Sequence, residues 1–232
     1  MRFAGDVAVV TGASRGIGRA VAAHLAAEGA LVVAAARTED ALAELAAGAD
    51  AIRAVPADVA ERTDVDRVFE AAADLGGCSI LVAAAGVLVS AGVEDTTDEA
   101  WGSTLGVNLT GAFLCSRAAF MQMRGRGGGR IVLVSSLSGV YATEKFPGLL
   151  AYNASKHGVV GLMEGLAVEG REHGISAISL SPGAVDTEML RAANPDLRAG
   201  LQPEDVARLV ADLLDGPIAA MSGANVPLFS NR

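Results

Sequence analysis

The feature that most constrains the fold is an alternation of short β-branched runs with longer alanine-rich stretches of helical pattern. Strands that alternate with helices indicate βαβ units and a parallel sheet. The runs are apolar at successive positions, so we expect helices to cover both faces of the sheet. The predicted strands are 7–10, 31–35, 52–55, 80–83, 131–135 and 175–180, and the predicted helices are 19–28, 39–47, 65–75, 101–123, 152–171 and 203–214. Segment 218–229 could add a last strand, although Pro217 and Pro227 interrupt it.

Right-handed crossovers between parallel strands lead to a doubly wound sheet of the Rossmann type. The chain has 232 residues, with no Ser/Pro-rich linker and no repeat at solenoid spacing. One domain typically takes ~100–200 residues. We therefore expect residues 1–232 to form a single α/β domain, a doubly wound parallel sheet with helices on both faces.

Charge and cysteine usage exclude several classes of partner. The 27 acidic and 18 basic residues give a net charge of −9, which repels nucleic acid and anionic lipid. The charge-free stretch 75–93 contains four glycines and two serines, so we interpret it as a buried strand with a loop and predict no membrane span. Cys78 and Cys115 show no metal-ligand spacing, which predicts two reduced thiols in a cytoplasmic protein without a metal site.

A glycine-rich loop follows the first predicted strand and precedes the first helix. It reads Thr11-Gly12-Ala13-Ser14-Arg15-Gly16-Ile17-Gly18. Gly12 allows the tight turn, Gly16 lets the backbone approach a pyrophosphate, and Gly18 permits close packing of the helix on the sheet. The free N–H groups of the helix then face the phosphates. The loop predicts a dinucleotide site that includes Ser14, Arg15 and Ile17; the alternative is a tight turn without a ligand.

Two scarce residue types stand four positions apart in one predicted helix. The chain has two tyrosines and two lysines, and one of each forms Tyr152-Asn-Ala-Ser-Lys156. This spacing places both side chains on one helix face. We expect the ammonium of Lys156 to lower the pKa of Tyr152 towards neutrality, so that the phenol can exchange a proton with a carbonyl or alcohol. The alternative is an ordinary aromatic–cation pair on a solvated helix.

Two further polar residues accompany this pair. Ser136 ends an apolar strand, where its hydroxyl faces the ligand crevice of a parallel sheet. Asn108 lies inside the helix predicted from residue 101, and a mid-helix Asn generally serves a hydrogen-bonding purpose.

These motifs, in this order, resemble the single-domain form of the short-chain dehydrogenase/reductase family, including its reductases of 3-oxoacyl carrier proteins. The resemblance implies catalysis by Asn108, Ser136, Tyr152 and Lys156. Tyr152 would be the general acid/base, Lys156 would also bind the nicotinamide ribose, Ser136 would bind the substrate oxygen, and Asn108 would hold a water. The family's other cofactor contacts map onto Asp58, Val59, Ala83, Gly86, Pro182, Gly183, Val185 and Thr187.

The sequence departs from the family pattern at three places. The Asn-Asn-Ala-Gly motif is Ala83-Ala84-Ala85-Gly86, which removes two amides that tie the central strands. Ser136 and Tyr152 lie 16 positions apart, about three more than in the family, which leaves Ser138 as an alternative serine. The tail reads SGANVPLFSNR instead of the usual Val-Asp-Gly-Gly ending.

The cofactor preference follows from the end of the second predicted strand. NAD-preferring members place an Asp there, whereas this chain has Ala36 followed by Arg37. With Arg15 in the loop, two guanidinium groups suit a 2′-phosphate. We therefore expect NADP(H) rather than NAD(H).

The expected substrate is a small carbonyl compound or alcohol, either an apolar ketone or an acyl-carrier thioester. Apolar residues near the expected pocket suggest this substrate class, and packing in the core explains the same residues equally well: Phe146, Leu149, Leu150, Met189, Leu190 and Leu197. The alternative function is a catalytically silent NAD(P)-sensing protein on the same fold. The helices 101–123 and 152–171 carry surplus apolar residues, so we expect a homodimer or homotetramer.

Overall fold

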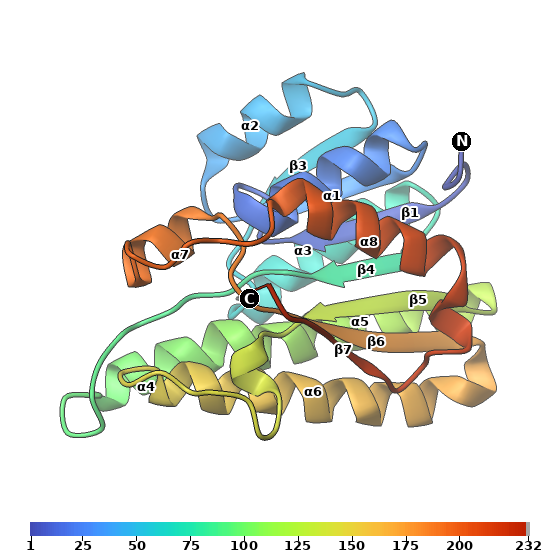
Figure 1. Ribbon diagram of the computed structural model, residues 1–232. Helices are drawn as coiled ribbons and strands as arrows, with labels where there is room; N and C mark the ends of the chain where they lie inside the picture. The colour runs from blue at the N-terminus through green and yellow to red at the C-terminus, as the bar shows by residue number, and fades with distance from the viewer. Residues whose placement is uncertain (231–232) are drawn as a thin grey trace.

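A seven-stranded parallel sheet runs through the centre of the computed structural model, which describes residues 1–230 (Figure 1). The strand order is β3-β2-β1-β4-β5-β6-β7, and every neighbouring pair is parallel. The strands are β1 Val7–Thr11, β2 Leu31–Ala36, β3 Ile52–Pro56, β4 Ile80–Ala83, β5 Gly129–Val134, β6 Ile175–Pro182 and β7 Asn225–Leu228. The predicted doubly wound α/β fold is confirmed.

Helices cover both faces of the sheet, and each layer closes its own core. One layer contains α1 (Gly16–Ala27), α2 (Glu39–Ala47) and α8 (Pro203–Asp215). The other contains α3 (Arg62–Asp74), α5 (Gly111–Arg126) and α6 (Leu150–Gly170). The central strands are buried on both faces, which explains their unbroken apolar sequence. The remaining helices are α4 (Asp98–Leu105), before α5, and the short α7 (Glu188–Ala193).

Two elements differ from their predicted form. The helix expected over 101–123 starts earlier, at Asp98, and is divided by a π-helical turn, η1 (Gly106–Thr110), before it continues as α5. Pro227 lies inside β7 and pairs with Ser181 rather than interrupting the strand. Proline is tolerated there because β7 is an edge strand, which needs backbone donors on one side only.

The strand order creates a switch point at the carboxyl edge of the sheet. The chain winds from β1 outwards to β3 and then returns to β4 on the other side of β1. Ligands of doubly wound sheets bind in the crevice at such a point. The loops after β1 and β4 approach each other closely there, because a Cβ added to Gly12 would lie 2.8 Å from the Cα of Ala85.

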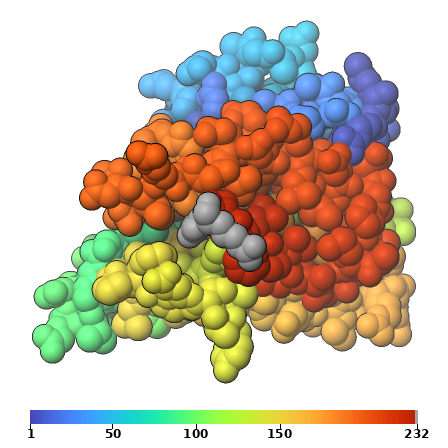
Figure 2. Space-filling model, in the orientation of Figure 1, coloured from blue at the N-terminus to red at the C-terminus, as the bar shows by residue number. Residues whose placement is uncertain are grey.

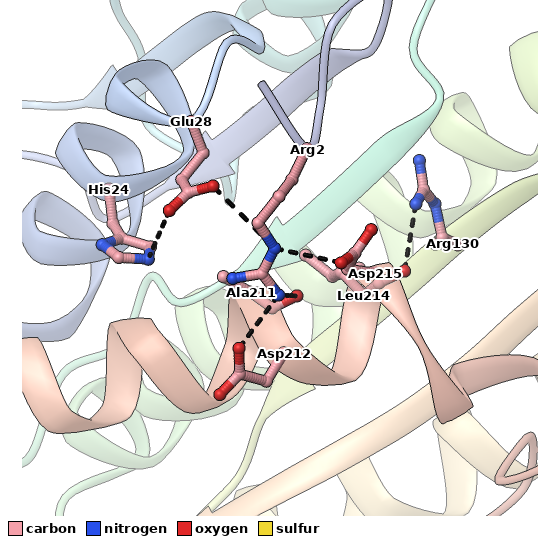
Figure 3. Close-up of polar contacts among 8 residues, drawn as sticks. All are labelled: Arg2, His24, Glu28, Arg130, Ala211, Asp212, Leu214 and Asp215. Carbon is pink, nitrogen blue, oxygen red and sulfur yellow. Dashed lines mark hydrogen bonds and ion pairs between the residues drawn. The ribbon is translucent and has the colours of Figure 1, made fainter.

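Polar contacts fasten the start of the chain at the opposite edge of the sheet (Figure 3). Arg2 donates to Asp212, at 2.9 Å, and to Asp215, at 3.0 Å, near the carboxyl end of α8. Glu28, after α1, lies 3.8 Å from the same guanidinium. The cluster therefore links α1 to α8 at the ends of these helices farthest from the crevice.

The charge-free stretch 75–93 folds into β4 and the loops on either side of it. Within residues 1–230, no helix has the length and apolar character needed to cross a membrane.

Candidate active site

A cavity of about 910 Å³ lies at the carboxyl edge of the sheet. In Figure 2 the orange region around α7 stands on one side, and the yellow segment before α6 and the green segment before α4 stand on the other. Most of the predicted site residues line this cavity. They are Gly12, Ser14, Arg15, Gly16, Ile17, Gly18, Arg37, Asp58, Val59, Gly86, Ser136, Tyr152, Lys156, Pro182, Gly183, Val185 and Thr187.

Ala83, a predicted cofactor contact, lies outside the lining of the cavity. Its side chain lies in β4, is 7 % exposed and belongs to the core under α3 and α5. The next three residues, Ala84, Ala85 and Gly86, line the cavity instead. Ala83 is the last residue of β4, and the residues that line the cavity begin at the next position.

The glycine loop has the conformation that a pyrophosphate cradle needs. Gly12 and Gly16 adopt φ values of +68° and +54°, which favour glycine. A Cβ on Gly18 would lie 2.4 Å from the carbonyl oxygen of Gly12, so no side chain fits there. Helix α1 begins at Gly16, so its free N–H groups open towards the cavity. The residues present fit a bound dinucleotide.

The two predicted arginines stand at one end of the cavity, and each is near a carboxylate. The guanidinium of Arg15 donates to Glu188 of α7 at 2.8 Å. That of Arg37 lies 3.9 Å from Asp58, just after Ala36 closes β2. Both arginine side chains are more than half exposed, which leaves the guanidinium groups accessible to an anionic ligand. Sequence reasoning missed Glu188, although it directly follows the predicted contact Thr187.

Ser136 and Tyr152 meet at the floor of the cavity. The Ser136 side chain hydrogen-bonds the phenol of Tyr152, and its Oγ also accepts from the backbone N–H of Ser138 at 3.1 Å. Ser136 is thus the serine in contact with the tyrosine, whereas Ser138 contributes its backbone to holding Ser136. The wide spacing between Ser136 and Tyr152 is absorbed by the loop over 140–149, which also lines the cavity.

Lys156 lies beside Tyr152, but the expected effect on the pKa of the phenol is wrong for this structure. The ammonium lies 5.6 Å from the centroid of the tyrosine ring and donates to the backbone oxygen of Val134 at 2.8 Å. Burial raises the pKa of Tyr152, and the hydrogen bond with Ser136 acts in the opposite direction. Burial also lowers the pKa of Lys156 to about 8. Desolvation outweighs the attraction between the two groups because both lie away from bulk water.

Asn108 lies behind the cavity, in the π-helical turn η1, and is buried. Its Oδ1 accepts from the N–H of Val87 at 2.8 Å, and its Nδ2 donates to the oxygen of Val87 at 2.9 Å. Nδ2 also donates to the hydroxyl of Ser155 on α6 at 3.0 Å. Asn108 therefore ties the loop after β4 to the helix that carries Tyr152, and its expected role in holding a water stays a prediction.

The loop after β4 stays anchored without the two amides of the family motif. The buried hydroxyl of Thr11 accepts from the backbone N–H groups of Ala84 and Ala85, each at 3.2 Å. These bonds connect the ends of β1 and β4 directly above the glycine loop. The hydroxyl of Thr11 thus holds the loop at the position where the family motif has its two amides.

The end of the cavity beyond Tyr152 is mainly apolar. Of the apolar residues expected there, Phe146, Leu149, Met189 and Leu190 line the cavity, whereas Leu150 and Leu197 lie outside its lining. Sequence reasoning missed several apolar lining residues, because nothing but their position after a strand marks them. These are Val87, Leu88, Leu137 and Val140.

Comparisons with known proteins agree with this geometry. A family model described as short chain dehydrogenase matches residues 6–198. An acetoacetyl-CoA reductase of Rhizobium meliloti is 36% identical over 232 residues, which cover 95% of each chain. The structure of a 3-ketoacyl-(acyl-carrier-protein) reductase from Brucella melitensis complexed with NADH has a TM-score of 0.88, with 30% identity and 97% coverage of both chains.

A second solved structure is described as an NAD(P)-dependent gluconate 5-dehydrogenase from Beutenbergia cavernae, with NADP bound at low occupancy. Its TM-score is 0.86, with 34% identity and coverage of 97% of this chain and 95% of that one. The family match spans most of the chain and includes the glycine loop and the Tyr152–Lys156 pair. The chain belongs to the short-chain dehydrogenase family of oxidoreductases.

Proposed function

We propose that this enzyme is an NADP-dependent reductase of carbonyl compounds, which interconverts a carbonyl group and a secondary alcohol. The observation that carries the proposal is the meeting of Ser136, Tyr152 and Lys156 at the floor of one cavity with the glycine loop. The same arrangement favours a reductase over the nucleotide sensor considered as the alternative, since a sensor does not need a phenol aimed at a second ligand.

The proposed roles follow from protonation states and position. A nicotinamide cofactor bound along the glycine loop would supply or accept the hydride. Because burial raises the pKa of Tyr152, its phenol is protonated at neutral pH and can donate that proton to a carbonyl oxygen. The hydroxyl of Ser136 is placed to hydrogen-bond the same oxygen as charge develops on it. Lys156 places its ammonium under the ring and stabilises the phenolate that remains.

The proposed preference for NADP rests on charge at the end of β2. The strand closes with the uncharged Ala36, so no carboxylate stands there to accept from a ribose 2′-hydroxyl. The guanidinium groups of Arg15 and Arg37 line the same end of the cavity. Guanidinium binds phosphate bidentately, so both groups favour a 2′-phosphate.

Both cysteines suit the expected cytoplasmic location. Cys78 and Cys115 are free and buried. Burial raises the pKa of each thiol to about 12. Neither thiol is therefore reactive, and both fit a protein of a reducing compartment.

The direct test is NADPH oxidation with a panel of neutral ketones, performed with the wild type and with Tyr152→Phe. We expect turnover by the wild type and a loss of at least about a hundredfold in kcat for the variant, since it lacks only the ionisable oxygen. NADPH should still bind to the variant, as followed by the fluorescence of the reduced cofactor. Activity within tenfold of the wild type would show that Tyr152 is not the acid.

A further inference from the structure

The two ends of the cavity differ in charge. Among the described residues, the basic side chains that line it are Arg15, Arg37 and Lys156, and none of these lies at the end beyond Tyr152. The first two stand at the end of β2 and in the glycine loop, and the third is buried under the tyrosine. The carboxylates that line the cavity are those of Asp58, Glu144 and Glu188. Asp58 and Glu188 lie beside Arg37 and Arg15, which leaves Glu144, in the loop before α6, as the charged group of the other end. The cations are thus placed for a cofactor and not for a second anion.

The one lysine in the loop beside Glu144 is turned away from the cavity. The ammonium of Lys145 donates to the backbone oxygens of Leu137 and Val140, at 3.0 and 2.7 Å, and to the hydroxyl of Thr143, at 2.7 Å. Those three oxygens take its three donors. The contacts also hold the turn at Ala142, whose φ of +59° lies in the left-handed region. Lys145 therefore stabilises the conformation of its own loop, and its ammonium is not available to a substrate.

The segments that surround this end carry an excess of acidic residues. Segments 87–100, 140–150 and 186–200 together contain eight Asp and Glu and three Lys and Arg. The first of them has four carboxylates and no cation, and it is tied to the second by the bond from the N–H of Ala91 to the oxygen of Gly148. Of the three cations, Lys145 is engaged as described, Arg191 pairs with Asp186, and Arg198 is exposed and lies outside the cavity lining. The three segments thus carry a charge of −5, which is more than half of the net charge of −9.

We infer that the enzyme reduces an uncharged, apolar carbonyl compound and discriminates against phosphate-bearing thioesters such as those of coenzyme A. This inference rests on the proposed reductase function and narrows its substrate class. Apolar side chains, including Leu88, Phe146 and Met189, line the end where the carbonyl compound would lie. A thioester carrier would place its phosphates at the acidic mouth, where residues 1–230 supply no lining cation to receive them.

The expected size of the discrimination follows from general electrostatics. A mouth of one sign changes the encounter rate of a charged ligand by a factor of about 10 to 1,000, and the effect falls as salt is added. The repulsion of a multiply charged thioester should therefore be measurable at low ionic strength and weaken as the Debye length shrinks to about 8 Å at physiological salt.

The test compares two substrates with the same reacting groups. Acetoacetyl-CoA carries phosphates, whereas the N-acetylcysteamine thioester of acetoacetate is uncharged and keeps the same ketone and thioester. With saturating NADPH at low ionic strength, we expect kcat/KM to be at least about tenfold higher for the uncharged thioester, with a gap that narrows as salt is added. Equal or better turnover of acetoacetyl-CoA would overturn the inference.

Charge reversal at the rim separates electrostatics from steric exclusion. In Glu144→Lys we expect the ratio of the two kcat/KM values to move at least about threefold towards acetoacetyl-CoA. The matched control is Glu70→Lys on α3, an exposed residue outside the cavity lining with the same change of charge, which should leave the ratio unchanged. An unmoved ratio in Glu144→Lys would contradict the electrostatic explanation.

The two proposals fail in different ways. If neither thioester nor any ketone of the neutral panel supports NADPH oxidation, the proposed reductase function itself is wrong. If carbonyl compounds are reduced and the phosphate-bearing thioester is preferred, the reductase function stands and only the inferred substrate class is wrong.

Discussion

At Lys156 the chain buries a cation whose partner is a backbone oxygen and not a carboxylate. The ammonium donates to the oxygen of Val134, and burial lowers its pKa from 10.5 to about 8. Below pH 8 the ammonium is charged in both the folded and the unfolded chain, and its desolvation lowers the free energy of unfolding. Above pH 10.5 the amine is neutral in both states, and this desolvation penalty is absent. The residue that supports Tyr152 therefore lowers stability at neutral pH.

We predict a pH-dependent difference between the wild type and Lys156→Met, both without cofactor. As pH rises from 8 to 10, the wild type should gain stability relative to the variant, by up to about 3 kcal/mol. Urea unfolding at pH 7, 8.5 and 10 measures the two free energies, and the effects of groups that do not interact with Lys156 cancel in the difference. A difference that stays flat over this range would mean that the pKa of Lys156 is not lowered by folding.

A second prediction at the residue scale concerns Arg37. Replacing it by Asp puts a carboxylate beside Asp58, where it repels a 2′-phosphate and can accept from a 2′-hydroxyl. We expect the ratio of kcat/KM for NADPH to that for NADH to fall by at least about tenfold. Arg62→Asp, an exposed position on α3 with the same charge change, is the control. An unchanged ratio in Arg37→Asp would make Arg37 an ordinary surface residue.

At the scale of elements, the sequence predicted the strands well because their apolar runs have sharp limits. Predicted and observed bounds coincide for β4 and α2, and elsewhere they differ by a few residues. No local pattern predicts the π-helical turn at Asn108, and the side chain of Asn108 bonds to Val87 and Ser155, which lie far away in the sequence.

The candidate site was predictable where motifs mark it and not where only packing does. The glycines of the loop, Tyr152 and Lys156 line the cavity as the spacing indicated. The raised pKa of Tyr152 was not predictable, since it depends on burial by elements that no local pattern reveals. The turning of Lys145 into its own loop likewise follows from the path of the backbone.

The junction of β1 with α1 gives a prediction at this scale. A methyl group at Gly18 would collide with the oxygen of Gly12 at 2.4 Å, so Gly18→Ala must push α1 away from the strand. We expect a loss of at least about 2 kcal/mol in stability and weaker NADPH binding. Gly125→Ala on α5 is the control, because nothing lies within 4 Å of its added methyl group, and helix propensity favours Ala by about 0.5–1 kcal/mol. Thermal unfolding and NADPH titration of both variants test the contrast; equal melting temperatures would contradict it.

At the scale of the whole molecule, the outer surface of the α5–α6 layer bears apolar side chains that the single chain leaves in water. Met121 and Phe113 on α5 are 70% and 43% exposed, and Val168 on α6 is 68% exposed. Trp101, on the preceding helix α4, is 39% exposed. On α6, Val159 and Met163 are buried against the sheet, whereas Val160, Leu162 and Leu166 are only half-buried. The apolar residues of this layer thus exceed what one inward stripe requires.

We predict that a second copy of the chain covers this surface, through symmetric pairing of α5 and α6. Light scattering at micromolar concentration should give at least twice the 23.4 kDa of one chain. The double variant Met121→Asp/Val168→Asp should shift the mass towards a monomer. Association would remove water from the new carboxylates without giving them a partner of opposite charge. Val93→Asp is the control, since Val93 is as exposed as Val168, at 72%, but lies outside this layer. A wild-type mass of one chain would refute the pairing, and a mass of four chains would require a second interface elsewhere.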